Sequence, residues 1–238
     1  MIGRLRFVSE KWEVTRDILR APSVRIEIFG NQVARDCYRS FTAPHPRYKV
    51  IPFKRWGVAL LQLPDTVEEY FLGKPRALLR YNRKRALSHG FKFREFASAD
   101  HLGDLSAIGS SADVRQGQAM ARHYIDEASL RAFCGRHPSL YGVFNEAGVL
   151  RAYAHAIEIG DVFFFNRILG HADDLKDGVV WLLLSEVVAE FICRRRTQGR
   201  PSWALYDTFW GASPGLRFFK QHVGFAPYRV EWIWSDGR

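Results

Sequence analysis

Residues 59–96 decide how this chain is organised, and they read ALLQLPDTVEEYFLGKPRALLRYNRKRALSHGFKFREF. A short apolar strand runs into residues 64–66, Pro-Asp-Thr, which is a start signal for a helix. A second helix is predicted over residues 74–89, because Pro75 stands in its first turn and Gly90 at its C-terminal stop. The stretch therefore predicts a strand, two helices and a return strand.

The second helix carries an unbroken run of positive charge. From residue 74 to residue 94 the chain has eight Lys and Arg residues and no acid: Lys74, Arg76, Arg80, Arg83, Lys84, Arg85, Lys92 and Arg94. So many like charges repel one another unless an anion or a carboxylate surface faces them. Five residues are the candidates for binding phosphate or nucleic acid: Arg76, Arg80, Arg83, Lys84 and Arg85.

The composition is typical of a compact protein. With 238 residues, of which 47% are hydrophobic, the chain is long enough for one large or two small domains with a sizeable core. Cys37, Cys134 and Cys193 form no CxxC pair, which favours reduced thiols and a cytoplasmic protein. No apolar run reaches about 18 residues, so no transmembrane segment is predicted.

The balance of charge is strongly basic. A net charge of +10 and an isoelectric point near 9.8 favour a polyanionic partner such as nucleic acid, a phosphorylated cofactor or an anionic membrane surface. The alternative is a general solubility charge without a partner. A second basic cluster, residues 194–196 with Arg200, adds weight to the first interpretation.

From residue 91 onward the predicted order is β-α-α-β-β-β-α-β-α-β. The strands are expected at 91–96, 140–145, 149–159, 162–169, 202–208 and 228–234, and the helices at 100–108, 126–137, 177–196 and 214–222. In the first part of the chain, before residue 64, strands are expected at 24–29, 48–53 and 57–63, with little helical periodicity. This order predicts an α/β (α+β) fold, with a mixed, mostly antiparallel central sheet flanked by helices.

A second motif lies near the C-terminus, where residues 205–232 read LYDTFWGASPGLRFFKQHVGFAPYRVEW. A strand ends in an acid, Asp207, and a Gly/Ser turn follows. The sequence Pro-Gly-Leu-x-x-Phe-Lys-x-x-x-Gly-Phe-x-Pro comes next, with Lys220 as its lysine.

Together, the helix that ends in Arg-Lys-Arg-Ala-x-x-x-Gly and this C-terminal motif resemble the peptidoglycan-bridge aminoacyltransferases (the Fem family). These enzymes belong to the wider GNAT acyltransferase superfamily. The resemblance implies a GNAT-like acyltransferase domain over residues 91–238. Residues 1–90 would then be a smaller N-terminal portion that contains the basic helix 74–89, too short for a complete second GNAT half, which is either degenerate or absent.

The resemblance implies a transferase that moves an acyl or aminoacyl group to an amine acceptor, a peptide or a small molecule. It implies no metal and no permanently bound cofactor; aminoacyl-tRNA is the expected donor, with acyl-CoA as the alternative. A second alternative is a non-catalytic nucleic-acid-binding module on a GNAT scaffold.

The same resemblance implies where the chemistry occurs. Two neighbouring strands would part between residues 165–168 and 205–207, and backbone N–H groups there would hold the acyl carbonyl. Asp207 would bind or deprotonate the amine, and Lys220 would stabilise the oxyanion or bind phosphate. A turn role for Asp207 and an exposed helix face for Lys220 are the structural alternatives. The expected donor-binding residues are Asn166, Arg167, Ile168, Lys176, Gly178 and Val179.

The loop after the strand at 162–169 bears on the donor. It reads GHADDLKDGVVW over residues 170–181, with three aspartates against Lys176, where a CoA pyrophosphate would sit in a GNAT enzyme. Asp177 is expected to be the N-cap of the following helix, and so to occupy the amides that a phosphate would use. This loop therefore favours aminoacyl-tRNA over acyl-CoA.

Overall fold

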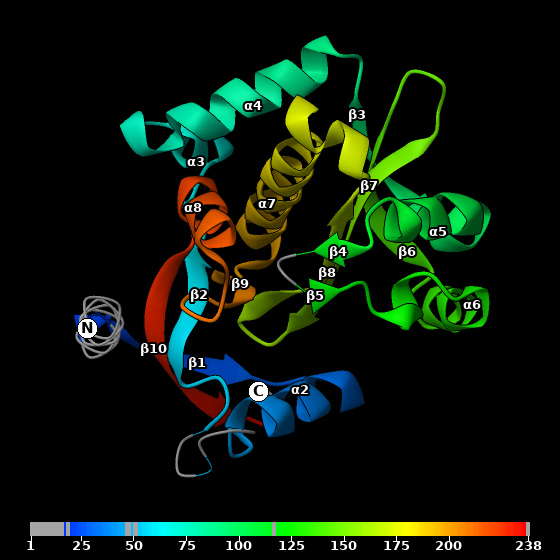
Figure 1. Cartoon of the computed structure of the whole chain (residues 1–238). Helices are drawn as coiled ribbons and strands as arrows, with labels where there is room; N and C mark the ends of the chain where they lie inside the picture. The colour runs from blue at the N-terminus through cyan, green and yellow to red at the C-terminus, as the bar shows by residue number, and fades with distance from the viewer. Residues whose placement is uncertain (1–16, 18–19, 46–48, 50–51, 116–117, 237–238) are drawn as a thin grey trace, which may run out of the picture.

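A single eight-stranded sheet runs through the computed structural model, which describes residues 17, 20–45, 49, 52–115 and 118–236 (Figure 1). The strands lie in the order β1 (Ser23–Ile28), β10 (Ala226–Trp234), β2 (Trp56–Gln62), β9 (Trp203–Thr208), β8 (Val162–Gly170), β7 (Leu150–Ile159), β6 (Ser139–Phe144) and β3 (Lys92–Ala97). The pairs β1–β10 and β8–β9 are parallel, and the other neighbours are antiparallel. The predicted fold class is confirmed.

Helices cover both faces of this sheet (Figure 1). One face packs against α3 (Val67–Phe71), α4 (Ala77–Ser88), α7 (Val179–Gln198) and α8 (Pro214–Val223). The other face packs against α2 (Gln32–Thr42), α5 (Leu102–Ser110) and α6 (Glu127–Arg136). A small separate hairpin, β4 (Val114–Arg115) with β5 (Gln118–Ala119), lies between α5 and α6 in the chain.

The long helix α7 is the centre of the larger core. Leu184, Val188 and Phe191 are buried, and Trp181 packs against the same cluster, which is the stripe that the sequence predicts. The ring of Phe191 stacks on Phe163 of β8, with ring centroids 3.9 Å apart. Because this face of α7 is buried against the sheet, a charge placed on it would have no water to stabilise it.

The predicted order of elements after residue 90 is confirmed. Strand β3 is followed by α5, α6, three antiparallel strands, α7, β9, α8 and β10, with a 3-10 turn over Ser98–His101 before α5 and another over Arg122–Tyr124 before α6. The basic helix is confirmed too: a 3-10 turn over Lys74–Arg76 leads into α4, and Gly90 follows it with φ +78°. At the preceding helix, the Thr66 hydroxyl accepts from the Glu69 N–H at 3.1 Å, as a helix cap should.

The expectation of little helix before residue 64 is wrong, because α2 occupies Gln32–Thr42. Its signals are present in the sequence: the Asn31 side chain caps the N-terminus, and Ala34 and Phe41 are buried at helical spacing. Half of the strand expected at 48–53 lies outside the described residues; in the other half, Pro52 forms an isolated bridge with Pro44 and Phe53 lies in a turn.

The N-terminal portion belongs to the same sheet as the rest of the chain. Strand β2 lies between β9 and β10, and β1 pairs with β10 at the edge. The boundary expected at residue 90 therefore passes through one sheet rather than between two separate layers. This insertion brings residues near β2 to the end of β9, where the candidate site lies.

Candidate functional site

The two parallel strands β8 and β9 part in the middle of the sheet. Their register pairs Val162 with Trp203, Phe163 with Ala204 and Phe164 with Leu205, and it ends there. Both strands continue, β8 to Gly170 and β9 to Thr208, so they are no longer paired with each other beyond this point. This is the parting that the sequence predicts.

Strand β8 has a bulge at Asn166. Its partner strand pairs His155 with Arg167 and Ala156 with Phe165, which leaves Asn166 as the extra residue. The bulge shifts the alternation of β8, so that Phe165 and Ile168 both face α7. Bulges re-aim backbone and side-chain groups and are frequent beside active sites.

Strand β9 has a matching irregularity at Asp207. Leu60 pairs with Leu205 and Val58 with Thr208, so β9 has one residue more than β2 over this stretch. Asp207 has φ +52°, the one left-handed backbone among the non-glycine residues that the structure describes. That conformation costs an ordinary residue roughly 1–2 kcal/mol, and Asp tolerates it better than most. Two bulges therefore border the same gap.

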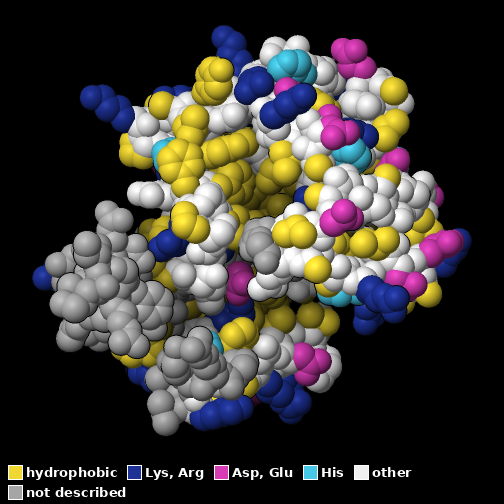
Figure 2. Space-filling model, in the orientation of Figure 1, with side chains coloured by type: hydrophobic (Ala, Val, Ile, Leu, Met, Phe, Trp, Pro, Cys, Tyr) yellow, Lys and Arg dark blue, Asp and Glu magenta, His cyan; other side chains and the backbone are white. Residues whose placement is uncertain are grey.

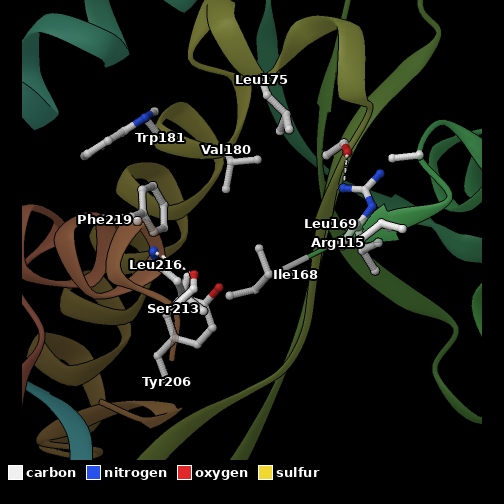
Figure 3. Close-up of a pocket in the computed structure, with 14 residues that line it drawn as sticks. Arg115, Ile168, Leu169, Leu175, Val180, Trp181, Tyr206, Ser213, Leu216 and Phe219 are labelled. Atoms are coloured by element: carbon white, nitrogen blue, oxygen red, sulfur yellow. Dashed lines mark hydrogen bonds between the residues drawn. The ribbon is translucent and has the colours of Figure 1, made fainter. Parts of the chain in front are cut away.

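A cavity of about 480 Å³ opens at this gap on the face of the sheet that α7 and α8 cover. In Figure 3 Trp181, Leu216 and Phe219 line one side, Arg115 and Leu169 line the other, and Ile168 lies between them. The remaining lining residues are Ala112, Val114, Gly170, Leu175, Val180, Tyr206, Ser213 and Gly215. Figure 2 shows hydrophobic side chains over α4 and α8 and along the walls of a hollow on this face.

A second cavity of about 320 Å³ adjoins the first and shares four lining residues with it: Arg115, Ile168, Leu169 and Ser213. Tyr124, Met120 and Gly211 line its other parts. Two adjoining cavities therefore lie where β8 and β9 part. Such an arrangement can hold two molecules that meet at the parted strands.

Arg115 is the one charged side chain among the described residues that line the larger cavity. Its guanidinium donates to the carbonyl oxygens of Gly170 at 2.8 Å and Ile108 at 2.9 Å, and to the Ser111 hydroxyl at 2.9 Å. Burial lowers the pKa of Arg115 from its ordinary value. Its donors are thus largely committed to the protein.

Asp207 forms an ion pair with Lys54, a residue that no pattern in the sequence singles out. The Lys54 side chain is only 7% exposed, and its ammonium lies 5.1–5.8 Å from the ring centres of Phe41, Phe53 and Phe164. The Asp207 side chain is 56% exposed. One carboxylate oxygen is therefore held by a buried cation while the group still reaches solvent.

Lys220 is buried, with 1% of its surface exposed, so the alternative of an exposed helix face is wrong. Its ammonium donates to the carbonyl oxygens of Tyr206 and Thr208, both at 2.7 Å. Burial lowers the pKa of Lys220 to about 8. Lys220, from α8, thus binds the residues on both sides of Asp207. Lys54, from the segment before β2, binds Asp207 itself.

The N-terminus of α7 differs from the expectation. Gly178, with φ +87°, takes the N-cap position, and no side chain caps the first turn. Asp177 instead lies 3.5 Å from Arg85, because the Gly178 N–H closes the preceding 3-10 turn (Ala172–Asp177) on the Leu175 carbonyl oxygen. The expectation that Asp177 occupies the first amides of α7 is wrong.

The other two acids of this loop are also turned away from α7. Asp174 accepts from Arg151 at 2.5 Å, and Asp173 is mostly exposed beside His171. The objection to a phosphorylated donor that rested on these aspartates is therefore weaker than the sequence suggests.

The expected donor-binding residues lie in three places. Ile168 lines both cavities. Asn166 is the exposed bulge residue, and Arg167 faces the opposite side, where its guanidinium lies 3.8 Å from the Phe133 ring centre. Lys176 is exposed on the 3-10 turn, whereas Gly178 and Val179 are buried under the cavity wall, and Val180 lines the cavity in their stead.

A buried histidine lies behind the bulge. His155 is 3.9 Å from His137, ring centre to ring centre, and its Nδ1 is 3.4 Å from the Asn166 amide nitrogen. Burial, then the neighbouring His137 and Arg167, lower the pKa of His155 to about 3. His155 is therefore a neutral packing residue at ordinary pH.

The basic residues of α4 are largely paired within the protein. Arg83 donates to Glu186 of α7 at 2.6 Å, Arg85 faces Asp177, and Arg80 donates to the Gly73 carbonyl oxygen at 2.9 Å. Arg76 is half-buried over the Tyr70 ring, and burial lowers its pKa. Lys84 remains exposed. Carboxylates of the protein itself thus neutralise part of the positive charge of the basic helix.

Among the described residues, no cluster of His, Cys, Asp and Glu could hold a metal ion. In the same part of the chain, no helix combines the length and apolarity needed to cross a membrane.

Neither the comparison with protein-family models nor that with curated proteins gives a match. Among solved structures, the chain is similar to a conserved protein of unknown function from Bacteroides thetaiotaomicron, with 12% identity, a TM-score of 0.50, and coverage of 70% of this chain and 55% of that one. It also resembles L-PGS from Bacillus licheniformis (15% identity, TM-score 0.45, 72% and 59% covered).

A third similar structure is a tandem GNAT protein from the clavulanic acid biosynthesis pathway, with 13% identity, a TM-score of 0.43, and coverage of 72% of this chain and 50% of that one. The chain therefore spans between half and three-fifths of the length of these proteins. At 12% identity, the similarity to the Bacteroides protein shows a similar fold and nothing about function.

Proposed function

We propose that this protein is a GNAT-like acyltransferase that moves an acyl group from an activated donor to an amine. The observation that carries the proposal is the gap between β8 and β9, which two bulges border and at which two adjoining cavities lie. Acyl transfer needs two reactants held in line and donors for the developing oxyanion, and parted parallel strands offer both.

The two hollows suit the two reactants. The donor would lie in the larger cavity, between the N-terminal turns of α7 and α8, and the amine would approach from the side of Tyr124 and Gly211. The amine nitrogen attacks the carbonyl carbon, and the bond from that carbon to the sulfur or oxygen of the carrier breaks. The proton lost by the amine passes to a base and from it to the departing sulfur or oxygen, so the carrier leaves as a thiol or hydroxyl.

Asp207 is the proposed base or ammonium-binding group. Asp207 stands at the end of β9, beyond the point where β9 and β8 part, and its side chain is more than half exposed although one oxygen is paired with Lys54. Lys220 is better explained as a brace, because its donors already bind the carbonyl oxygens of Tyr206 and Thr208. Backbone N–H groups near the bulge at Asn166 are then the proposed oxyanion donors.

Aminoacyl-tRNA and acyl-CoA both remain proposed donors. Two features of the structure favour acyl-CoA more than the sequence does. The uncapped first turn of α7 leaves amides that favour an anion, which supports a phosphorylated donor such as acyl-CoA. The internal pairing of Arg83 and Arg85 removes part of the argument for tRNA and for a nucleic-acid-binding module. The Fem-type resemblance stays a sequence-based hypothesis.

The test is a transfer assay with both donor classes. The purified protein is incubated with an amine acceptor mixture and either acyl-CoA or charged tRNA, and acylated products are sought by mass spectrometry. We expect amide products that require the protein and that Asp207→Asn reduces. If neither donor gives a protein-dependent product across acceptors, the acyltransferase proposal is wrong.

A further inference from the structure

We infer that the larger cavity binds the uncharged, apolar chain of the transferred acyl group. The inference rests on the proposed function and names its substrate class. It begins from the charges around the cavity: among the described residues that line it, none is an Asp or a Glu. An aminoacyl group carries an ammonium, which is costly to take out of water without an acid or several carbonyl oxygens around it.

Ser213 and most of the Arg115 guanidinium already have partners within the protein. The Ser213 hydroxyl accepts from the Leu216 N–H at 3.4 Å, and Arg115 binds two carbonyl oxygens and a hydroxyl. The Arg115 Nε is buried without a partner among the described residues, and it suits a neutral carbonyl oxygen. Burial raises the pKa of Tyr206, so its phenol is neutral.

The remaining walls are apolar. The rings of Trp181 and Phe219 meet edge to face with centroids 4.6 Å apart, and Leu216, Ile168 and Val180 line the cavity beside them (Figure 3). Leu175 and Val114, which also line it, are 45% and 61% exposed. Large apolar side chains left open at the rim of a concave site are typical of a surface that an apolar ligand covers.

The experiment uses thioesters of N-acetylcysteamine, which carry the acyl chain without the nucleotide of CoA. Acetyl, octanoyl and dodecanoyl thioesters are compared for binding by calorimetry and for transfer to an amine. Each methylene that becomes buried strengthens binding by up to about fourfold. We expect the octanoyl thioester to bind at least about tenfold more tightly than the acetyl thioester.

Two variants locate the effect in the cavity. Leu216→Trp fills it and should shift the preference toward shorter chains, whereas Phe218→Trp, at an exposed position of the same helix, should not. Val180→Asp places a carboxylate in the first turn of α7, where an acid suits the helix N-terminus and folding is retained. It should weaken octanoyl binding at least about tenfold and weaken acetyl binding less.

The outcomes separate the two proposals. Equal binding and transfer for all chain lengths would overturn the inference and leave the acyltransferase function standing. Transfer from charged tRNA with no binding of acyl thioesters would do the same. Binding that depends on acyl-chain length, without transfer to any amine, would support the cavity assignment and contradict the acyltransferase function. The absence of both binding and transfer would contradict both proposals.

Discussion

The ammonium group of Lys54 and the carboxylate of Asp207 join the segment before β2 to the end of β9. Lys54 is buried among aromatic rings, and the Asp207 carboxylate neutralises its positive charge. Removing one member of a buried ion pair leaves the other charge uncompensated, which is more damaging than losing both. Any test of Asp207 as a base must therefore separate catalysis from the loss of this pair.

The first prediction makes that separation with two variants. Asp207→Asn should lower turnover by on the order of 10²–10⁴ and leave donor binding near the wild-type value, because the base is lost. Lys54→Met breaks the same pair but keeps the acid, so it should retain most of the turnover, and it should lower the melting temperature less than Asp207→Asn because the carboxylate it leaves unpaired still reaches solvent. Steady-state kinetics and thermal melts on both variants check this. Full turnover in Asp207→Asn would leave Asp207 with a structural role alone.

The second prediction concerns Lys220 and pH. Its folded-state pKa is lowered to about 8 from an ordinary 10.5, so between these values the unfolded chain binds more protons than the folded protein. Stability should therefore rise with pH across this window, by up to about 3 kcal/mol. Denaturant unfolding at several pH values measures it, with Lys220→Met as the comparison. A slope that Lys220→Met leaves unchanged would show that Lys220 does not titrate as its burial implies.

The third prediction concerns the core around α7. Val188 is fully buried, and Val188→Asp places an unpaired charge there at a cost of several kcal/mol. We expect it to abolish soluble expression or to give a protein without a cooperative melt. Cys193→Asp, at an exposed position of the same helix, is the matched control and should express normally. Equal behaviour of the two variants would contradict the burial of this face of α7.

The fourth prediction concerns the basic helix. If tRNA is bound there, replacing Arg83, Lys84 and Arg85 with Gln should weaken binding and flatten its dependence on salt. The internal pairs of Arg83 and Arg85 mean that Lys84 should account for most of the change, and the salt slope should fall by about one for each phosphate that the variant no longer binds. Filter binding across a salt series measures this. Unchanged tRNA affinity in the triple variant would exclude α4 as the tRNA surface.

Much of the fold could be predicted because its signals are local. Gly90, Gly148 and Gly160 have positive φ at the turns where the sequence places stops, and α7 follows its apolar periodicity. The resemblance at both ends of the chain also predicts the parting of β8 and β9. Local signals of this kind survive in a single sequence.

The details of the site depend on long-range packing and could not be predicted in the same way. A bulge such as Asn166 adds one residue to a strand without any special residue type, and the burial of Lys54 depends on rings from three separate segments. The sequence predicts Asp177 as a helix cap, but in the structure its carboxylate pairs with Arg85, which comes from a helix packed on α7. Trp181, Leu216 and Phe219 read as core residues, and the parting of the strands makes them a cavity wall.

The position of β2 between β9 and β10 sets an order of events during synthesis. Strand β2 leaves the ribosome early, and both of its neighbours come from the last part of the chain. Until they arrive, its two edges and its apolar residues have no partners, and contacts of such long sequence separation form slowly. We therefore expect a slow final folding step, and a strand that depends on chaperones or on rapid completion of translation to avoid aggregation.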